Sequence, residues 1–249
     1  MTAASATAAA GAASSAASLG LLLRLRDRVD LGLGAASAAT DSAAGAASAQ
    51  TPDTVILISV DGFRPDYLDR GVTPNLNAIA KTGVLAEGMR PSFPSITFPN
   101  HYTLVTGKRP DRNGVVGNAM EDPAIPGVRF SMSNRDAVMD RRWWDEAEPV
   151  WVTAEKNNMW TATMFWPGSE APVRGVRPHD WRIFGGSFAA ERRVETVIGW
   201  LARPAAERPK FVTLYFDDVD HAGHVYGPEA KETNEAIAKV DAAIGQLWS

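Results

Sequence analysis

The chain has 249 residues, of which 45% are hydrophobic and 22% are charged, and its formal net charge is −4. This length suits one large domain or two small ones, and the charge gives no general attraction to nucleic acid or anionic membranes. The sequence contains no cysteine. Disulfide bonds, thiolate zinc sites and a cysteine nucleophile are therefore excluded, and any metal must be held by Asp, Glu or His.

The first 50 residues have a composition unlike that of the rest of the chain. They include 19 alanines and 7 serines but no aromatic residue. A segment with so few large apolar side chains cannot bury enough surface to offset the entropy lost on ordering. We therefore expect residues 1–50 to form a disordered, low-complexity leader outside the fold, and residues 51–249 to form the folded part.

The leader has some features of an export signal. Its apolar run, residues 19–23, is too short to span a membrane, so no transmembrane segment is expected there. Arginines follow this run, whereas the basic region of a secretory signal precedes the apolar stretch. Ala47-Ser48-Ala49 resembles a small-residue cleavage site, which either arises by chance in Ala/Ser-rich sequence or belongs to an atypical signal. We expect a periplasmic or secreted protein of bacterial type.

Strand and helix patterns alternate from residue 54 onward. The continuous apolar run of residues 55–60 predicts a strand buried on both faces. Thr73 and Pro74 are typical of a helix start, and Gly83 of its end. The remaining predicted elements are helices at 97–106, 188–202 and 231–247, and strands at 160–165 and 210–216. This alternation predicts an α/β fold with a mainly parallel sheet flanked by helices.

Acidic residues follow two of the predicted strands. Asp61 comes after residues 55–60, and Asp217, Asp218 and Asp220 come after residues 211–216. The carboxyl ends of parallel strands meet at one edge of a sheet, so these carboxylates should converge. His224 follows Asp220 by four residues, on a predicted loop that contains Gly223, and both side chains could face one metal. The alternative, that these acids are helix caps and solvated loop residues, stays open.

Thr97 stands where the second predicted helix begins. A hydroxyl there faces free backbone N–H groups and the positive end of the helix dipole. This position favours an alkoxide and would also hold a phosphate group. The residues alone favour the alternative in which Thr97 or Ser95 only caps the helix, because Ser and Thr so often do so.

Seven stretches of residues 54–249 together resemble one known family. They are Val60-Asp61-Gly62-Phe63-Arg64-Pro65-Asp66-Tyr67, Thr73-Pro74-Asn75-Leu76, residues 91–102, Leu104-Val105-Thr106-Gly107, residues 112–118, Phe165-Trp166-Pro167-Gly168-Ser169 and residues 215–228. In this order they are similar to the nucleotide pyrophosphatase/phosphodiesterase family, a branch of the alkaline phosphatase superfamily. The resemblance implies an alkaline-phosphatase-like fold.

The resemblance also implies a role for individual residues. Thr97 matches the family's nucleophile, which attacks phosphorus and becomes covalently modified. Two zinc ions are implied, with Asp61 and Thr97 at one and Asp220 and His224 at the other. The implied substrate contacts are Asn118, which hydrogen-bonds a phosphoryl oxygen, and Phe98 and Tyr215, which line the nucleotide pocket.

The same resemblance indicates which of the four histidines is a zinc ligand. The family pattern Asp-x-x-Gly-His selects His224 over His221 as the ligand. We expect His101 and His179 to be structural or surface residues. Trp181 or Phe184 is a further candidate for the nucleotide pocket.

The implied function is zinc-dependent hydrolysis of nucleotides or related phosphodiesters, and no surface for polymeric nucleic acid is evident. The family pattern needs a further Asp-His pair and a later His, which these 249 residues do not contain. We therefore expect the N-terminal, C-terminally truncated portion of the family's domain, with impaired activity. The alternatives are a non-catalytic phosphate-binding or interaction module, and a phosphomonoesterase or phospholipid headgroup hydrolase of the same superfamily.

Overall fold

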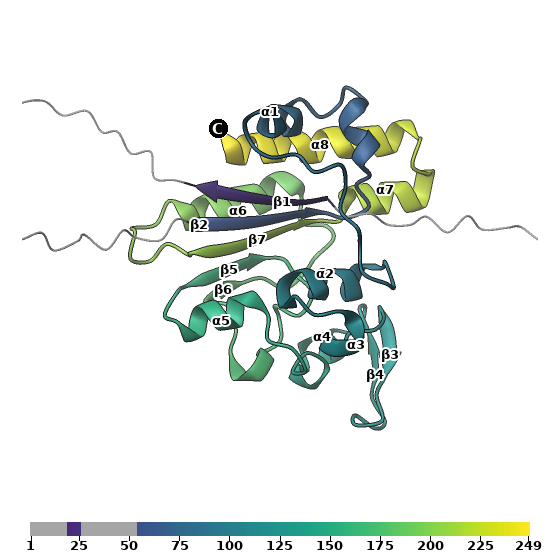
Figure 1. The fold of residues 1–249 in the computed structure, drawn as a ribbon, viewed down its shortest axis with the longest axis vertical. Coiled ribbons are helices and arrows are strands. Elements are labelled where there is room, and N and C mark those ends of the chain that lie inside the picture. The colour runs from purple at the N-terminus through teal and green to yellow at the C-terminus, as the bar shows by residue number, and fades with distance from the viewer. Residues whose placement is uncertain (1–18, 26–53) are drawn as a thin grey trace, which may run out of the picture.

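The computed structural model describes residues 19–25 and 54–249. Its centre is a five-stranded sheet with strand order β1-β2-β7-β5-β6, in which β1 is antiparallel to β2 and the other neighbours are parallel (Figure 1). The strands of this sheet are β1 (Leu19–Leu25), β2 (Thr54–Val60), β5 (Thr161–Met164), β6 (Asp180–Trp181) and β7 (Phe211–Phe216). A separate hairpin pairs β3 (Ala119–Glu121) with β4 (Arg129–Ser131).

Helices cover both faces of the sheet. One face carries α1 (Pro74–Thr82), α6 (Ala190–Leu201), α7 (Asp218–Tyr226) and α8 (Lys231–Trp248). The other carries α2 (Thr97–Thr106), α4 (Arg135–Met139) and α5 (Val150–Lys156), and the short α3 (Pro110–Asn113) packs on α2. The mainly parallel, helix-flanked sheet predicted from the sequence is confirmed. Within residues 19–25 and 54–249, no helix has both the length and the apolar character needed to cross a membrane.

The two central strands bury opposite side chains in two separate cores. Successive side chains of a strand point to opposite faces of the sheet. In β2, Ile56 and Ile58 therefore belong to the core under α1, α6 and α8, whereas Leu57 packs against the core under α2, α4 and α5. In β7, Leu214 joins the first core and Tyr215 the second. This alternation places Tyr215 on the side of the sheet where α2 lies.

Strand β1 lies in the segment that the sequence places outside the fold. Residues 19–25 pair with β2 in the register Leu19↔Val60 to Leu25↔Thr54. The physical reason lies in the backbone, because an edge strand presents unpaired N–H and C=O groups that another strand can pair. The rest of the predicted leader, including the cleavage-like site at 47–49, lies outside the described residues.

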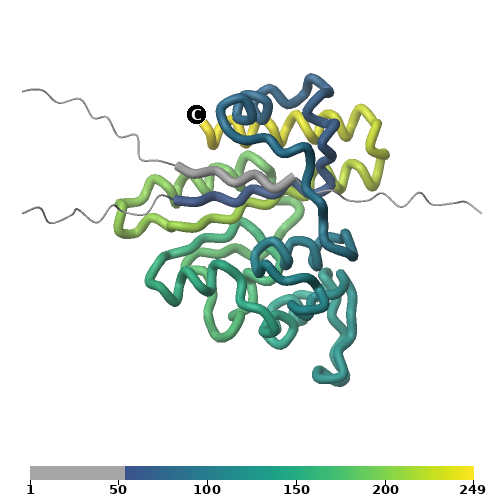
Figure 2. The backbone as a smooth tube through the Cα atoms, in the orientation of Figure 1, coloured from purple at the N-terminus to yellow at the C-terminus, as the bar shows by residue number. Residues whose placement is uncertain are grey.

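Helices α1 and α8 pack closely at a glycine. The C-terminal end of α8 lies beside α1 (Figure 2), and Asp241 of α8 accepts hydrogen bonds from the backbone nitrogens of Asn75 and Leu76. Asp241 thus caps the start of α1 from another helix. It also accepts from the Asn75 amide nitrogen at 2.8 Å, which holds that side chain in place. A Cβ at Gly245 would lie 2.4 Å from the Asn75 side chain.

We expect Gly245→Ala to destabilise the fold by about 1–3 kcal/mol, because the fixed Asn75 side chain leaves no room for a methyl group. The measurement is the free energy of unfolding from urea denaturation. Gly199→Ala is the matched control, since a Cβ at this position in α6 meets nothing within 4 Å. The control should be neutral or stabilising, because alanine has the higher helix propensity. Equal effects of the two substitutions would contradict the close packing of α1 on α8.

Candidate active site

Thr97 is the first residue of α2 and is not its cap. The cap position is Ile96, which has extended dihedral angles and no side-chain capping bond. Ser95 lies one residue earlier still, so the structure does not support the alternative in which either hydroxyl serves only as the cap. Thr97 instead lines a cavity of about 240 Å³.

Asn118 lies against the same first turn of α2. Its side-chain oxygen accepts a hydrogen bond from the backbone nitrogen of Phe98 at 2.9 Å. This contact satisfies one of the free N–H groups at the helix start. It also places the Asn118 amide beside the residue that follows Thr97.

Asp61 and Asp220 meet at the carboxyl edge of the sheet, as the sequence predicts. The Asp61 backbone nitrogen donates to the Phe216 carbonyl at 2.9 Å, which continues the pairing of β2 with β7. Gly62 has φ +70°, and a Cβ there would lie 2.7 Å from the Asp220 Cα. Only glycine fits this left-handed, closely packed position. Gly62 therefore lets the Asp61 loop approach α7.

The Asp61 carboxylate is 1% exposed and is held by Tyr215. The Tyr215 hydroxyl donates to Asp61 Oδ2 at 2.9 Å, and the Gly62 nitrogen donates to Oδ1 at 3.1 Å. Burial, followed by the charge of Asp61, raises the pKa of Tyr215 well above its ordinary value. The phenol therefore stays protonated and remains a donor to Asp61.

Asp220 and His224 lie on a helix, so the predicted loop around Gly223 is wrong. Residues 218–226 form α7, and one helical turn brings residues four apart together. His224 Nε2 is 3.5 Å from Asp220 Oδ1. Burial and then the nearby charge of Asp61 raise the pKa of Asp220, whereas His224 acts in the opposite direction. The two carboxylates are thus close enough to repel each other.

Arg193 is a buried cation beside these acids. It is 1% exposed and lies 2.8 Å from Asp217 Oδ1 and 3.7 Å from Asp218 Oδ2. Its guanidinium also donates to the carbonyl oxygens of Phe188 and Tyr215. Arg193 therefore joins the end of β7 to the start of α7.

The cavity gathers most of the candidate residues. Thr97, Phe98, Tyr215, Asp220 and His224 all line it. Phe184, but not Trp181, is among the lining residues, and His221 lines it beside His224. Asp61 and Asn118 are not lining residues, but each is hydrogen-bonded to one, Asp61 to Tyr215 and Asn118 to Phe98.

Several lining residues were not among the site residues expected from the sequence, among them Trp166, Arg135 and Glu170. Trp166 follows β5, so its place at the carboxyl end of a parallel strand was a usable signal. Arg135 and Glu170 form an ion pair between α4 and the segment after β5. No sequence pattern indicates a contact between residues so far apart.

The donor atoms at this edge suit a divalent metal ion. Carboxylate oxygens and imidazole nitrogens are ligands of Zn²⁺ and similar ions, and a cation would relieve the repulsion between Asp61 and Asp220. In the part of the chain that the structure describes, no three His, Asp or Glu side chains are gathered closely enough to hold a metal ion. The residues present therefore fit part of a metal site.

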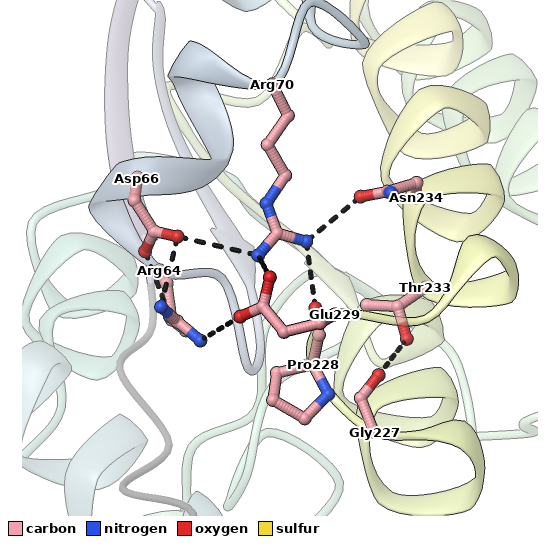
Figure 3. A network of polar contacts seen from close by, with 8 residues as sticks. All are labelled: Arg64, Asp66, Arg70, Gly227, Pro228, Glu229, Thr233 and Asn234. Atoms are coloured by element: carbon pink, nitrogen blue, oxygen red, sulfur yellow. Dashed lines mark hydrogen bonds and ion pairs between the residues drawn. The ribbon is translucent and has the colours of Figure 1, made fainter.

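A polar network joins residues 64–70, which follow Asp61, to residues 228–234, which follow α7 (Figure 3). Arg70 donates to the Pro228 carbonyl and to Asn234, and contacts Glu229 at 2.6 Å. Arg64 contacts the same Glu229 carboxylate at 2.9 Å. Glu229 thus links the segment that follows Asp61 to the segment that follows the helix of His224.

The remaining two histidines lie as expected for structural and surface residues. His101 is fully buried in α2. His179 is exposed, and its ring stacks on Trp160 with 3.7 Å between the ring centroids.

Comparisons with known proteins identify one family. The family model described as type I phosphodiesterase / nucleotide pyrophosphatase matches residues 55–249. An uncharacterized pyrophosphatase/phosphodiesterase of Schizosaccharomyces pombe is 44% identical over 194 residues, which are 78% of this chain and 40% of that protein. Human ectonucleotide pyrophosphatase/phosphodiesterase family member 1 is 39% identical over 203 residues, which are 81% of this chain and 22% of that protein.

Solved structures agree with the sequence comparisons. Murine ectonucleotide pyrophosphatase/phosphodiesterase 5 superposes with a TM-score of 0.71 at 32% identity, over 77% of this chain and 50% of that one. An inactive threonine-to-alanine variant of the same murine protein, in complex with AMP, matches equally well. The fold is therefore alkaline-phosphatase-like, and the chain spans between about a fifth and a half of the length of these relatives.

Proposed function

Because the chain belongs to the type I phosphodiesterase/nucleotide pyrophosphatase family, we propose that it hydrolyses nucleotides or related small phosphodiesters with Thr97 as the nucleophile. One observation carries this proposal. Thr97, the Asp220–His224 pair and several aromatic side chains line a single cavity. A nucleophile, a pair of potential metal ligands and an aromatic surface on which a nucleobase could stack would thus be within reach of one ligand.

Thr97 would attack phosphorus and form a covalent ester while the leaving group departs from the opposite side. A threonine hydroxyl is a weak nucleophile at its ordinary pKa and needs activation. Its position at the start of α2 places it next to the positive end of the helix dipole, which stabilises negative charge. Water would then hydrolyse the ester and regenerate Thr97.

Asn118 would stabilise charge on the transferred group. The side-chain oxygen of Asn118 already accepts a hydrogen bond from the Phe98 nitrogen. The N–H groups of its amide would therefore be the ones that donate to a phosphoryl oxygen. Donors fixed before the reaction stabilise charge that develops in the transition state.

Two zinc ions would complete this site, one held by Asp61 and Thr97 and the other by Asp220 and His224. When bound, zinc acts as a Lewis acid and lowers the pKa of an oxygen that it coordinates. Tyr215 would orient Asp61 through the hydrogen bond to Oδ2. Hydrogen bonds of this kind to ligating carboxylates fix their direction and tune their basicity.

The aromatic side chains support a nucleotide as the substrate. Phe98, Tyr215 and Phe184 line the cavity, and planar rings stack well on a base. The AMP complex of the murine relative supports the same interpretation. Export to the periplasm or cell exterior, suggested by the leader, remains part of this proposal.

Zinc-dependent release of nitrophenol from bis-p-nitrophenyl phosphate tests the function. We expect slow turnover, because zinc sites normally use three or four ligands and the described residues offer about half of those needed for two ions. The comparison substrate is p-nitrophenyl phosphate, a monoester with the same leaving group. Faster hydrolysis of the monoester would favour a phosphomonoesterase, and binding of AMP without any hydrolysis would favour a phosphate-binding module.

His224→Ala is expected to weaken zinc binding by at least about 10-fold, because it removes one of the two side chains of the α7 pair, and loss of a ligand's hydrogen-bond partner alone typically costs about 10–100-fold. Isothermal titration of the chain with zinc measures the effect. His221→Ala is the matched control, since His221 lines the same cavity but directly follows Asp220 and cannot share its helical face. A larger loss in His221→Ala than in His224→Ala would contradict the ligand assignment.

A further inference from the structure

A fully buried histidine contacts the nucleophile residue from inside the fold. His101 Nδ1 is 2.7 Å from the Thr97 carbonyl oxygen, and Nε2 is 2.8 Å from the Ser59 hydroxyl oxygen. Both His101 and Ser59 are 0% exposed. We propose that His101 is a positioning residue that fixes Thr97 for attack. This inference rests on the proposed role of Thr97.

The partners of the His101 ring define its tautomer. A carbonyl oxygen can only accept, so Nδ1 must carry the proton that is donated to Thr97. In the neutral ring, Nε2 then accepts from the Ser59 hydroxyl. Ser59 lies in β2, two residues before Asp61. The ring thus joins the start of α2 to the strand that directly precedes Asp61, a proposed zinc ligand.

Two aromatic side chains pack against the buried His101 ring. Trp166 and Tyr215 contact it edge to face, with centroid distances of 5.2 and 5.1 Å. Trp166 also donates from its indole nitrogen to the His101 carbonyl at 3.0 Å. Tyr215 is the residue whose hydroxyl holds Asp61. One packed unit therefore fixes the nucleophile and the carboxylate relative to each other.

Fixing the Thr97 backbone also restricts its hydroxyl. Threonine is β-branched, so few side-chain rotamers are open to it once the backbone is set. A displacement of 1 Å at a reacting atom can cost about 10²-fold in rate. His101 does not line the cavity, so its effect would be exerted through Thr97.

Two substitutions separate the two hydrogen bonds of the ring. In His101→Asn the amide nitrogen takes the place of Nδ1 and can still donate to Thr97. In His101→Gln the amide reaches the place of Nε2 and keeps only the Ser59 contact. We expect His101→Gln to lower kcat by about 10²-fold with KM unchanged, and His101→Asn to retain most of kcat. His179→Gln, at an exposed histidine outside the cavity, should leave both constants unchanged.

NMR gives a measurement that does not depend on activity. In the unmodified chain, ring ¹⁵N shifts should show the proton of His101 on Nδ1, and the Thr97 methyl signal should move in His101→Gln but not in His101→Asn. A proton on Nε2, or equal effects of the two substitutions on kcat and on the methyl signal, would overturn the inference. If the unmodified chain shows no zinc-dependent hydrolysis, the proposed function fails, and the NMR result alone then decides whether His101 fixes Thr97.

Discussion

Thr97→Ala is expected to reduce zinc-dependent phosphodiester hydrolysis by about 10³-fold or more, down to the rate without enzyme. The substitution removes the hydroxyl at the first position of α2, which lines the same cavity as Asp220 and His224. The covalent route is then closed, because alanine cannot form the phosphoester. Zinc affinity should fall less than hydrolysis does, since Asp61, Asp220 and His224 remain.

Mass spectrometry of the chain incubated with zinc and a nucleotide ester measures the same step directly. The unmodified chain should gain the mass of the transferred phosphoryl or nucleotidyl group, and Thr97→Ala should gain none. Thr106→Ala is the matched control, because Thr106 ends the same helix. Its hydroxyl donates to the backbone carbonyl oxygens of Tyr102 and Lys108. Hydrolysis that survives in Thr97→Ala at the unmodified rate would remove Thr97 from the mechanism.

Arg193→Met should destabilise the fold by about 3–5 kcal/mol, the range seen when one partner of a buried ion pair is removed. Methionine fills similar volume, so the loss is electrostatic. Asp217 would lose its buried cation at 2.8 Å, and the carbonyl oxygens of Phe188 and Tyr215 would lose their donor. Burial already raises the pKa of Asp218, and the charge of Arg193 opposes that rise.

Urea denaturation followed by circular dichroism measures this loss. Arg192→Met is the matched control, because Arg192 is the neighbouring residue but is 73% exposed and pairs only with Glu195. Exposed pairs of this kind contribute about 0–1 kcal/mol. Equal losses of unfolding free energy in the two variants would contradict the prediction. They would mean that the cost of desolvating Arg193 cancels its attraction to Asp217 and Asp218.

Local patterns were enough to predict one edge of the sheet and the elements β2, β5, β7, α1, α2, α6 and α8. The largely apolar runs before Asp61 and Asp217 identify β2 and β7, because near-continuous apolar runs of this length are typical of strands buried on both faces. Gly83 and Gly107 end α1 and α2 as predicted. The convergence of Asp61 with Asp220 followed from the direction of parallel strands.

Other features depend on contacts between distant segments. The sequence around Gly223 suggested a loop because glycine disfavours helices, but packing of α7 against α8 and β2 outweighs that preference. The ion pair of Arg135 with Glu170 likewise has no local signal.

The candidate site shows the same division. The sequence made Thr97, Asp61, Asp220 and His224 candidates through donor type and spacing, which are local properties. Only the resemblance of seven stretches to one family gave these residues roles, since the residues alone favoured Thr97 as a helix cap. The tertiary structure decided what holds them, since Tyr215 on Asp61 and His101 on Thr97 are hydrogen bonds that form only after β2, β7 and α2 have packed together. Partners of this kind are set by the folded arrangement, and no spacing along the chain encodes them.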